Sequence, residues 1–243
     1  MSAQAAVQPQ FDDSPAVPLW WGALSAAAMI LTLYLIFDWV STEATMGIVQ
    51  RIFYFHVPAA IASFTASFVG GIASIMYLVK RDNRYDDLSL AANESVVLFA
   101  MVNIVMGSLW AKPIWGIWWT WDARLTSSFL LLFLYAAYLV IRQAAPVEQR
   151  AVVCAVICIL GMADVPLIYL SNRLFRTQHP APVIGGDANS GLAPDMLKLF
   201  VIANVTMLIF WGLVVRTRRR VARLERAAED LTRRINELSD TGV

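Results

Sequence analysis

Two long apolar runs flank the stretch Trp115-Gly-Ile-Trp-Trp-Thr-Trp-Asp-Ala-Arg-Leu-Thr126, which holds four of the nine tryptophans in the chain. If the stretch is helical, three indoles and one carboxylate share a face of two turns: Trp115, Trp118, Trp119 and Asp122. Trp121 then points in another direction. Tryptophans often mark the membrane interface at helix ends, but such belts are usually spread over many helices. The clustering therefore favours an aromatic shelf for a large, planar and mostly apolar ligand.

The composition is that of a polytopic membrane protein. Hydrophobic residues make up 58% of the 243 residues and charged residues only 15%, which excludes a soluble globular domain. The glycine-rich segment 185–191 lacks the Lys-Ser/Thr of a phosphate-binding loop. We therefore expect no enzyme activity, and any ATP hydrolysis would come from a partner subunit. Cys154 and Cys158 are expected to pack in the core rather than to form a redox pair.

Apolar runs of helical length predict an all-α integral membrane protein with six transmembrane helices. The first run, 19–40, corresponds to roughly 33 Å of helix, against roughly 30 Å of bilayer hydrocarbon. The other spans are expected at about 57–79, 94–111, 125–141, 151–170 and 195–215. Residues 1–18 are expected to form a flexible leader, because their lack of Lys and Arg does not match a signal peptide. The charged segment 80–87 is expected to be a solvated turn.

The distribution of basic residues predicts which side each loop occupies. Six spans place both termini on one side, and the short loops on the two sides carry equal numbers of Lys and Arg. The orientation is then decided by a basic cluster after the last span, because the positive-inside rule places such clusters in the cytoplasm. The cluster is Arg216, Arg218, Arg219 and Arg220. The prediction is N-in and C-in, with the Trp-rich stretch as an outer loop or interfacial helix between the third and fourth spans.

Residues 216–243, which follow the six-span domain 19–215, are patterned as a helical tail. Apolar residues repeat every seven positions in two series: Val221, Ala228 and Ile235, and Leu224, Leu231 and Leu238. With Arg and Glu between them, they predict a cytoplasmic amphipathic helix. Such a helix docks on a partner, self-associates or lies on anionic lipid, unless it is simply a solvated helix with frayed ends.

The only two histidines, His56 and His179, both lie on the predicted outer face, close to Pro58 and Pro180. Neutral imidazoles that approach from opposite faces suit the axial positions of a haem iron. Zinc is the alternative metal, but no third Cys, Glu or His completes a tetrahedral set there. Porphyrin also suits the aromatic shelf. Four arginines on the same side are candidate partners for the propionates: Arg51, Arg124, Arg173 and Arg176.

Two aspartates allow several interpretations. Asp122 is placed to orient an indole N–H, to pair with Arg124, to face the ligand, or to cap the following helix. Asp164 lies inside the fifth span, where an ionised group is costly and usually functional or paired. Pro166 also allows Asp164 a structural role, because a proline frees backbone groups that need new partners.

The Trp-rich stretch resembles the "WWD" signature of the haem-handling proteins of cytochrome c assembly. The Arg-Leu-Thr after Asp122, the six spans and the short length resemble the cytochrome c maturation protein C branch (CcmC, haem exporter protein C). Residues 51–60, Arg-Ile-Phe-Tyr-Phe-His-Val-Pro-Ala-Ala, resemble its first-histidine segment, and Ala163-Asp-Val-Pro166 resembles its fifth-span segment. The match covers residues 19–215, and His179 lies in the loop of the family's second histidine. The resemblance implies nothing about the tail, residues 216–243.

The resemblance implies a multi-pass bacterial inner-membrane protein that binds haem b transiently at its periplasmic face. It implies axial ligation by His56 and His179, and a platform made of Trp115, Trp118, Trp119, Trp121 and Asp122. Such proteins present haem to a periplasmic haem chaperone, cytochrome c maturation protein E. They work with an ABC-type complex of A, B and D subunits, in contact with membrane lipid, and no nucleic acid is involved.

Two other functions are compatible with the sequence. A b-type electron-transfer protein also uses histidine pairs, although usually within facing spans. A permease subunit of a haem or solute ABC transporter would need a polar path through the bundle, for which Asn103, Asp164 and Asn204 are the few candidates.

Overall fold

The computed structural model describes residues 17–175, 179 and 192–240. Its helices are α1 (Leu19–Tyr34), the π-helical turn η1 (Leu35–Trp39), the 3-10 helix η2 (Ile48–Ile52), α2 (Phe53–Lys80), α3 (Asn83–Trp115), α4 (Ala123–Ala144), α5 (Val147–Leu174) and α6 (Pro194–Asp240). Within these described ranges the only β-type pairing is an isolated bridge between Glu43 and Gly47. Most of the predicted leader, 1–16, lies outside the described residues.

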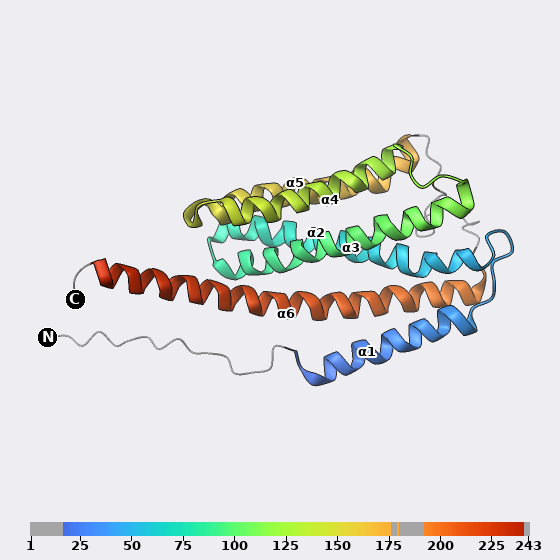
Figure 1. Ribbon diagram of the computed structural model, residues 1–243, viewed down its shortest axis with the longest axis horizontal. Coiled ribbons are helices and arrows are strands. Elements are labelled where there is room, and N and C mark those ends of the chain that lie inside the picture. The colour runs from blue at the N-terminus through green and yellow to red at the C-terminus, as the bar shows by residue number, and fades with distance from the viewer. Residues whose placement is uncertain (1–16, 176–178, 180–191, 241–243) are drawn as a thin grey trace.

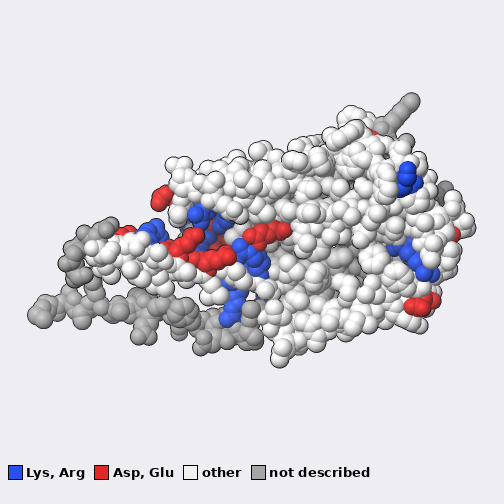
Figure 2. Space-filling model, in the orientation of Figure 1, with Lys and Arg blue, Asp and Glu red and all other residues white. Residues whose placement is uncertain are grey.

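Six of these helical segments are long and apolar enough to cross a membrane, which confirms the prediction of an all-α membrane protein with six such segments. On the face shown in Figure 2, charged side chains gather at the two ends of the bundle, and a wide uncharged belt separates them. This distribution is the one expected of a protein whose middle lies in hydrocarbon. Which end faces which side of the membrane stays a prediction.

The α2–α3 hairpin forms the middle of the bundle (Figure 1). The α4–α5 hairpin packs on one side of it, α6 packs on the other, and α1 lies outermost against α6. Close approach is possible because small buried residues line one stripe of α2: Ala59, Ala62, Ala66, Gly70 and Ala73. At Gly70 a Cβ atom would lie 2.1 Å from Oδ1 of Asn93, so glycine alone admits this α3 side chain.

The predicted core role of the cysteines is confirmed, since Cys154 and Cys158 are both buried and free. The thiol of Cys158 donates to Oδ1 of Asn93 at 3.1 Å. Nearby, the hydroxyls of Ser67 and Tyr135 lie 2.6 Å apart, so this part of the core is held by polar contacts between helices.

The solvated-turn prediction for 80–87 is wrong for its second half, because α3 begins at Asn83 rather than near 94. Asp86 and Asp87 are only 4% and 3% exposed. Asp86 accepts two hydrogen bonds from the guanidinium of Arg142, at 2.9 and 2.8 Å, and a third from Arg226. Buried carboxylates need such partners, and both arginines are too distant in the chain to be recognised from local pattern.

The predicted helical tail is confirmed as a helix, but it is not a separate element. The last span continues without a break from Pro194 to Asp240, which corresponds to roughly 70 Å of helix. Its C-terminal part extends past the end of the bundle where α2 meets α3 (Figure 1). The opposite end of the bundle therefore contains the start of α2, the end of α3 and the α3–α4 connection.

Candidate functional site

The candidate site lies at the end of the bundle opposite the tail. His56 occupies the first turn of α2, Trp115 ends α3, and Asp122 directly precedes α4. Three of the four predicted arginines are described: Arg51 in η2, Arg124 at the start of α4 and Arg173 at the end of α5. Arg176 lies outside the described residues.

His56 lies inside the helix rather than at its start, because η2 runs directly into α2. Its Nδ1 atom lies 2.9 Å from the backbone carbonyl of Asn103 on α3. A carbonyl only accepts, so the hydrogen bond places the imidazole proton on Nδ1. Nε2 is therefore the atom with a free lone pair, as required of a metal ligand.

Two residues of α3 define the space around the His56 ring. A Cβ atom at Gly107 would lie only 2.8 Å from Cε1 of His56, so the imidazole occupies the place of the missing side chain. The ring centroid of Trp110 lies 5.9 Å from that of His56, at an interplanar angle of 67°. Asn103, Gly107 and Trp110 thus form one face of α3, at helical spacing i, i+4 and i+7. This spacing is present in the sequence, but no local signal marks these residues as part of the site.

His179 reaches the same end of the bundle from the segment after α5. Its Nδ1 atom lies 3.6 Å from Oδ2 of Asp122. Its ring contacts that of Trp115 edge-on, with 5.4 Å between centroids. Burial, followed by the nearby guanidinium of Arg124, lowers the pKa of His179 below its usual value and outweighs the opposing effect of Asp122. The imidazole is therefore neutral at neutral pH, with Nδ1 directed at an acceptor.

The capping interpretation of Asp122 is confirmed. Its Oδ1 accepts from the backbone N–H of Leu125 at 2.9 Å, and its Oδ2 accepts from the hydroxyl of Thr120 at 3.2 Å. The second oxygen also faces His179. One carboxylate therefore starts α4 and orients an imidazole.

The single-helix-face interpretation of the Trp-rich stretch is wrong. Gly116 has φ of +75° and ends α3 in the left-handed conformation, and no regular helix covers 116–122. Trp118 and Trp121 project from this loop with 55% and 72% of their surface exposed. Trp119 meets Trp121 at 78°, edge to face, with 5.7 Å between centroids. The indoles are clustered, but they do not form one flat shelf.

Several buried polar atoms at this end of the bundle have no hydrogen-bond partner within the described ranges. They are Nε1 of Trp110, Nε1 of Trp119, Nε of Arg51 and Oδ1 of Asn103. Buried donors are almost always satisfied in folded proteins, so three donors in this state are available to an acceptor-bearing ligand. Arg124 lies within electrostatic range of both imidazoles. Arg173 is exposed and lies over the ring of Tyr169.

Comparison with known proteins assigns the family. The family model described as heme exporter protein C (CcmC) matches residues 3–234. The chain belongs to the heme exporter protein C family. The match extends into the tail, beyond the 19–215 expected from the motifs, so part of the tail is included in the CcmC pattern.

Individual relatives carry the same name. The chain is 34% identical over 166 residues to heme exporter protein C of Escherichia coli (strain K12), which is 65% of this chain and 66% of that protein. It is 30% identical over 207 residues to heme exporter protein C of Haemophilus influenzae, covering 81% and 84%. A putative cytochrome c biosynthesis ccmC-like mitochondrial protein of Marchantia polymorpha is 31% identical over 180 residues, covering 74% and 75%. The chain thus spans just under two thirds of the Escherichia coli relative.

Proposed function

We propose that this protein binds haem as a cargo between His56 and His179 and hands it on for the assembly of c-type cytochromes. The observation that carries the proposal is the state of the two imidazoles. The chain has only two, both lie at one end of the bundle, and the Nδ1 of each faces an acceptor. In this arrangement Nε2 of each ring is the atom that we assign to iron.

The surroundings support a porphyrin better than a bare metal ion. Exposed and partly buried indoles offer apolar surface to the porphyrin faces: Trp115, Trp118, Trp119 and Trp121. Propionates need cations and N–H donors, which Arg51, Arg124, Trp110 and Trp119 supply. Arg173 and Arg176 are further candidates. Within the described ranges no group of three or more His, Cys, Asp or Glu is arranged to hold a metal ion.

Transfer requires that the cargo be released, and an exposed site favours release. Trp118 and Trp121 lie mostly in solvent, so a second protein can reach the bound haem directly. In this proposal the site faces the periplasm from a bacterial inner membrane, with both termini in the cytoplasm. The recipient is the haem chaperone, cytochrome c maturation protein E, and an ABC-type complex of A, B and D subunits supplies ATP hydrolysis. The relatives' names, heme exporter and cytochrome c biosynthesis protein, support this assignment.

The absorption spectrum of the purified protein tests the proposal. We expect bis-histidine haem bands in the wild type, and loss or shift of these bands in His56→Ala and His179→Ala. The control is Trp20→Phe, because Trp20 lies on α1, far from both histidines in the chain, and is 66% exposed. Two histidine variants with wild-type bands, in protein that inserts normally, would refute the ligand assignment.

A b-type electron-transfer function is the second candidate. His56 lies within α2 and forms a hydrogen bond with the backbone carbonyl of Asn103 on the facing helix α3, as a ligand within facing spans would. The two functions differ in what happens to the haem. A carrier loses its haem to the apo-chaperone, whereas an electron-transfer protein retains it. Mixing haem-loaded protein with apo-chaperone and following the haem band distinguishes them.

A further inference from the structure

The C-terminal part of α6 presents an apolar seam that is exposed in the part of the chain that the structure describes. Five large residues of the two seven-residue series are exposed: Val221 39%, Leu224 50%, Leu231 41%, Ile235 64% and Leu238 60%. They lie along one side of a continuous helix. Exposed apolar stripes of this length usually mark an interaction site.

Ion pairs hold the other side of the same helix against the bundle. Arg226 donates from Nε to Asp87 at 2.9 Å and from Nη2 to Asp86 at 2.5 Å. Further along, Glu229 accepts from Arg150 at 3.1 Å. The charged cluster in Figure 2 lies where the tail meets the bundle. These contacts fix the rotation of α6, so the apolar seam cannot turn inward to cover itself.

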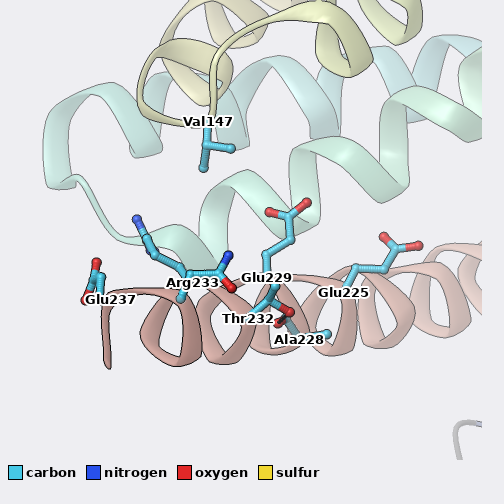
Figure 3. A pocket seen from close by; sticks show the side chains of 8 residues that line it. Val147, Glu225, Ala228, Glu229, Thr232, Arg233 and Glu237 are labelled. Carbon is cyan, nitrogen blue, oxygen red and sulfur yellow. Dashed lines mark hydrogen bonds between the residues drawn. The ribbon is translucent and has the colours of Figure 1, made fainter. Parts of the chain in front are cut away.

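Figure 3 shows the space between the tail and the α4–α5 turn. It is an open hollow of about 710 Å³. On the α6 side it is lined by Ala228, the small residue of the heptad series, and by six polar residues: Glu225, Glu229, Thr232, Arg233, Asn236 and Glu237. Glu229 points from α6 toward Val147 (Figure 3). The side chains that the tail directs toward its own bundle are therefore mostly polar, whereas the five large apolar residues of the seam stay exposed.

The residue types in the seam favour one kind of partner. In heptad terms, the a positions carry Val221, Ala228 and Ile235, and the d positions carry only leucine. Two of the three a residues, Val221 and Ile235, are β-branched. β-Branched residues at a, combined with Leu at d, favour a parallel two-stranded coiled coil over higher oligomers. Two copies inserted in one membrane with the same topology project their tails in the same direction, which is the parallel arrangement.

The charges beside the seam suit a second copy of the same chain. In a parallel pair, position g of one helix faces position e of the next heptad in the other. That places Arg220 beside Glu225 of the other copy, twice by symmetry. The two remaining g–e pairs, Ala227 with Thr232 and Arg234 with Ser239, bring no like charges together. Glu225, which is exposed and bonds to Arg218 in the single chain, has a side chain long enough to exchange partners.

We propose that two copies of this protein associate through their tails, residues 221–238, as a parallel coiled coil. Three heptads form a marginal coiled coil in free solution. Here the helix is already ordered by its ion pairs, and confinement to one membrane raises the effective concentration of the second copy. Both factors reduce the entropic cost of association. The proposal does not depend on haem binding.

Cysteine crosslinking in native membranes tests the pairing in the full-length protein. The native cysteines are buried, so disulfide-linked dimers are expected to arise only from the newly introduced cysteine. We expect Leu224→Cys and Leu231→Cys to form disulfide-linked dimers on mild oxidation, several-fold more than Asp230→Cys at an outer heptad position. Equal yields at all three positions, in protein that inserts normally, would overturn the proposal. The seam would then be covered by lipid or by another protein instead of a second copy.

A charge exchange tests the register. Arg220→Glu places Glu opposite Glu225 and should reduce the Leu231→Cys crosslink several-fold. Adding Glu225→Arg restores opposite charges and should recover it. If the double variant stays as weak as the single one, the two copies are not paired in this register. The haem spectrum, measured in parallel, should be unchanged throughout.

Discussion

Oδ2 of Asp122 lies 3.6 Å from Nδ1 of His179, while Oδ1 of the same carboxylate caps α4 by accepting from Leu125. The Trp-rich loop and the second histidine are therefore linked through one side chain. Asp122→Asn separates the two roles, because Asn is as good a helix cap as Asp but has no charge to orient the imidazole. We expect haem affinity to fall about 10–100-fold with little loss of stability, as measured by haem titration and thermal unfolding.

The matched control is Asp82→Asn at the other end of the bundle. Asp82 also caps a helix, by accepting from the backbone N–H of Arg84 at 2.9 Å. Its substitution should leave haem affinity unchanged. Equal effects of the two substitutions on haem affinity would mean that Asp122 acts only as a cap.

The pH dependence of haem binding follows from the lowered pKa of His179. Nε2 coordinates iron only when the imidazole is neutral, so binding should persist below the ordinary histidine value of about 6.5 and be lost at lower pH. Because the folded protein disfavours the proton, this group's stability contribution is present above about pH 6.5 and is lost as pH falls through the lowered pKa. Absorption spectra recorded from neutral to acidic pH measure haem binding, and unfolding experiments over the same range measure the stability.

Asp122→Asn should also shift the pH at which haem binding is lost. The Asp122 carboxylate raises the pKa of His179 against the larger effects of burial and Arg124. Removing its charge should move the acid limb of the haem-binding profile to lower pH. A shift to higher pH would contradict the assignment of that limb to His179.

Gly107→Ala should mimic the loss of His56. The added Cβ atom would lie 2.8 Å from Cε1 of His56, so the imidazole must move and its bond to the Asn103 carbonyl must break. We expect haem bands close to those of His56→Ala. Gly22→Ala is the control, since a Cβ atom there makes only an ordinary contact at 3.7 Å with Val17. Wild-type haem bands in Gly107→Ala would show that haem ligation does not depend on the observed position of the His56 ring.

Asp86→Ala should destabilise the bundle at the tail end. Asp86 is 4% exposed and accepts from both Arg142 and Arg226. Removing one partner of a buried ion pair typically costs about 3–5 kcal/mol. Asp230→Ala, which removes an exposed pair with Arg233, should cost about 0–1 kcal/mol. Thermal unfolding in detergent compares the two, and similar losses would show that the Asp86 cluster is not a buried network.

Much of the fold could be predicted from the sequence because its signals are local. A run of apolar residues must satisfy its backbone hydrogen bonds within the helix wherever it lies in hydrocarbon, so 19–40 and 195–215 predict spans without reference to the rest of the chain. The spacing of Leu224, Leu231 and Leu238 likewise predicts a helix. The order of the spans also brings 56 and 122 to the same end of the bundle.

The sequence-based predictions are wrong where the burial or backbone conformation of a residue depends on contacts outside its own segment. Asp86 and Asp87 have the composition of a solvated turn, but Arg142 and Arg226 bury them. The Trp-rich stretch has helical spacing, yet Gly116 ends α3 there and Asp122 starts a new helix. In both cases a favourable local pattern was overridden by contacts or chain reversals that it does not contain.

The sequence by itself determined the six apolar helices, the pairing of two histidines with clustered tryptophans, and the heptad tail, because hydropathy and periodicity act over a few turns of one segment. Only the tertiary structure decided which nitrogen of His56 is free, which carboxylate faces His179, and that the apolar side of the tail points outward. These features are set by atoms tens of residues apart that meet only when the helices pack, and directional hydrogen bonds and buried charges then select one arrangement.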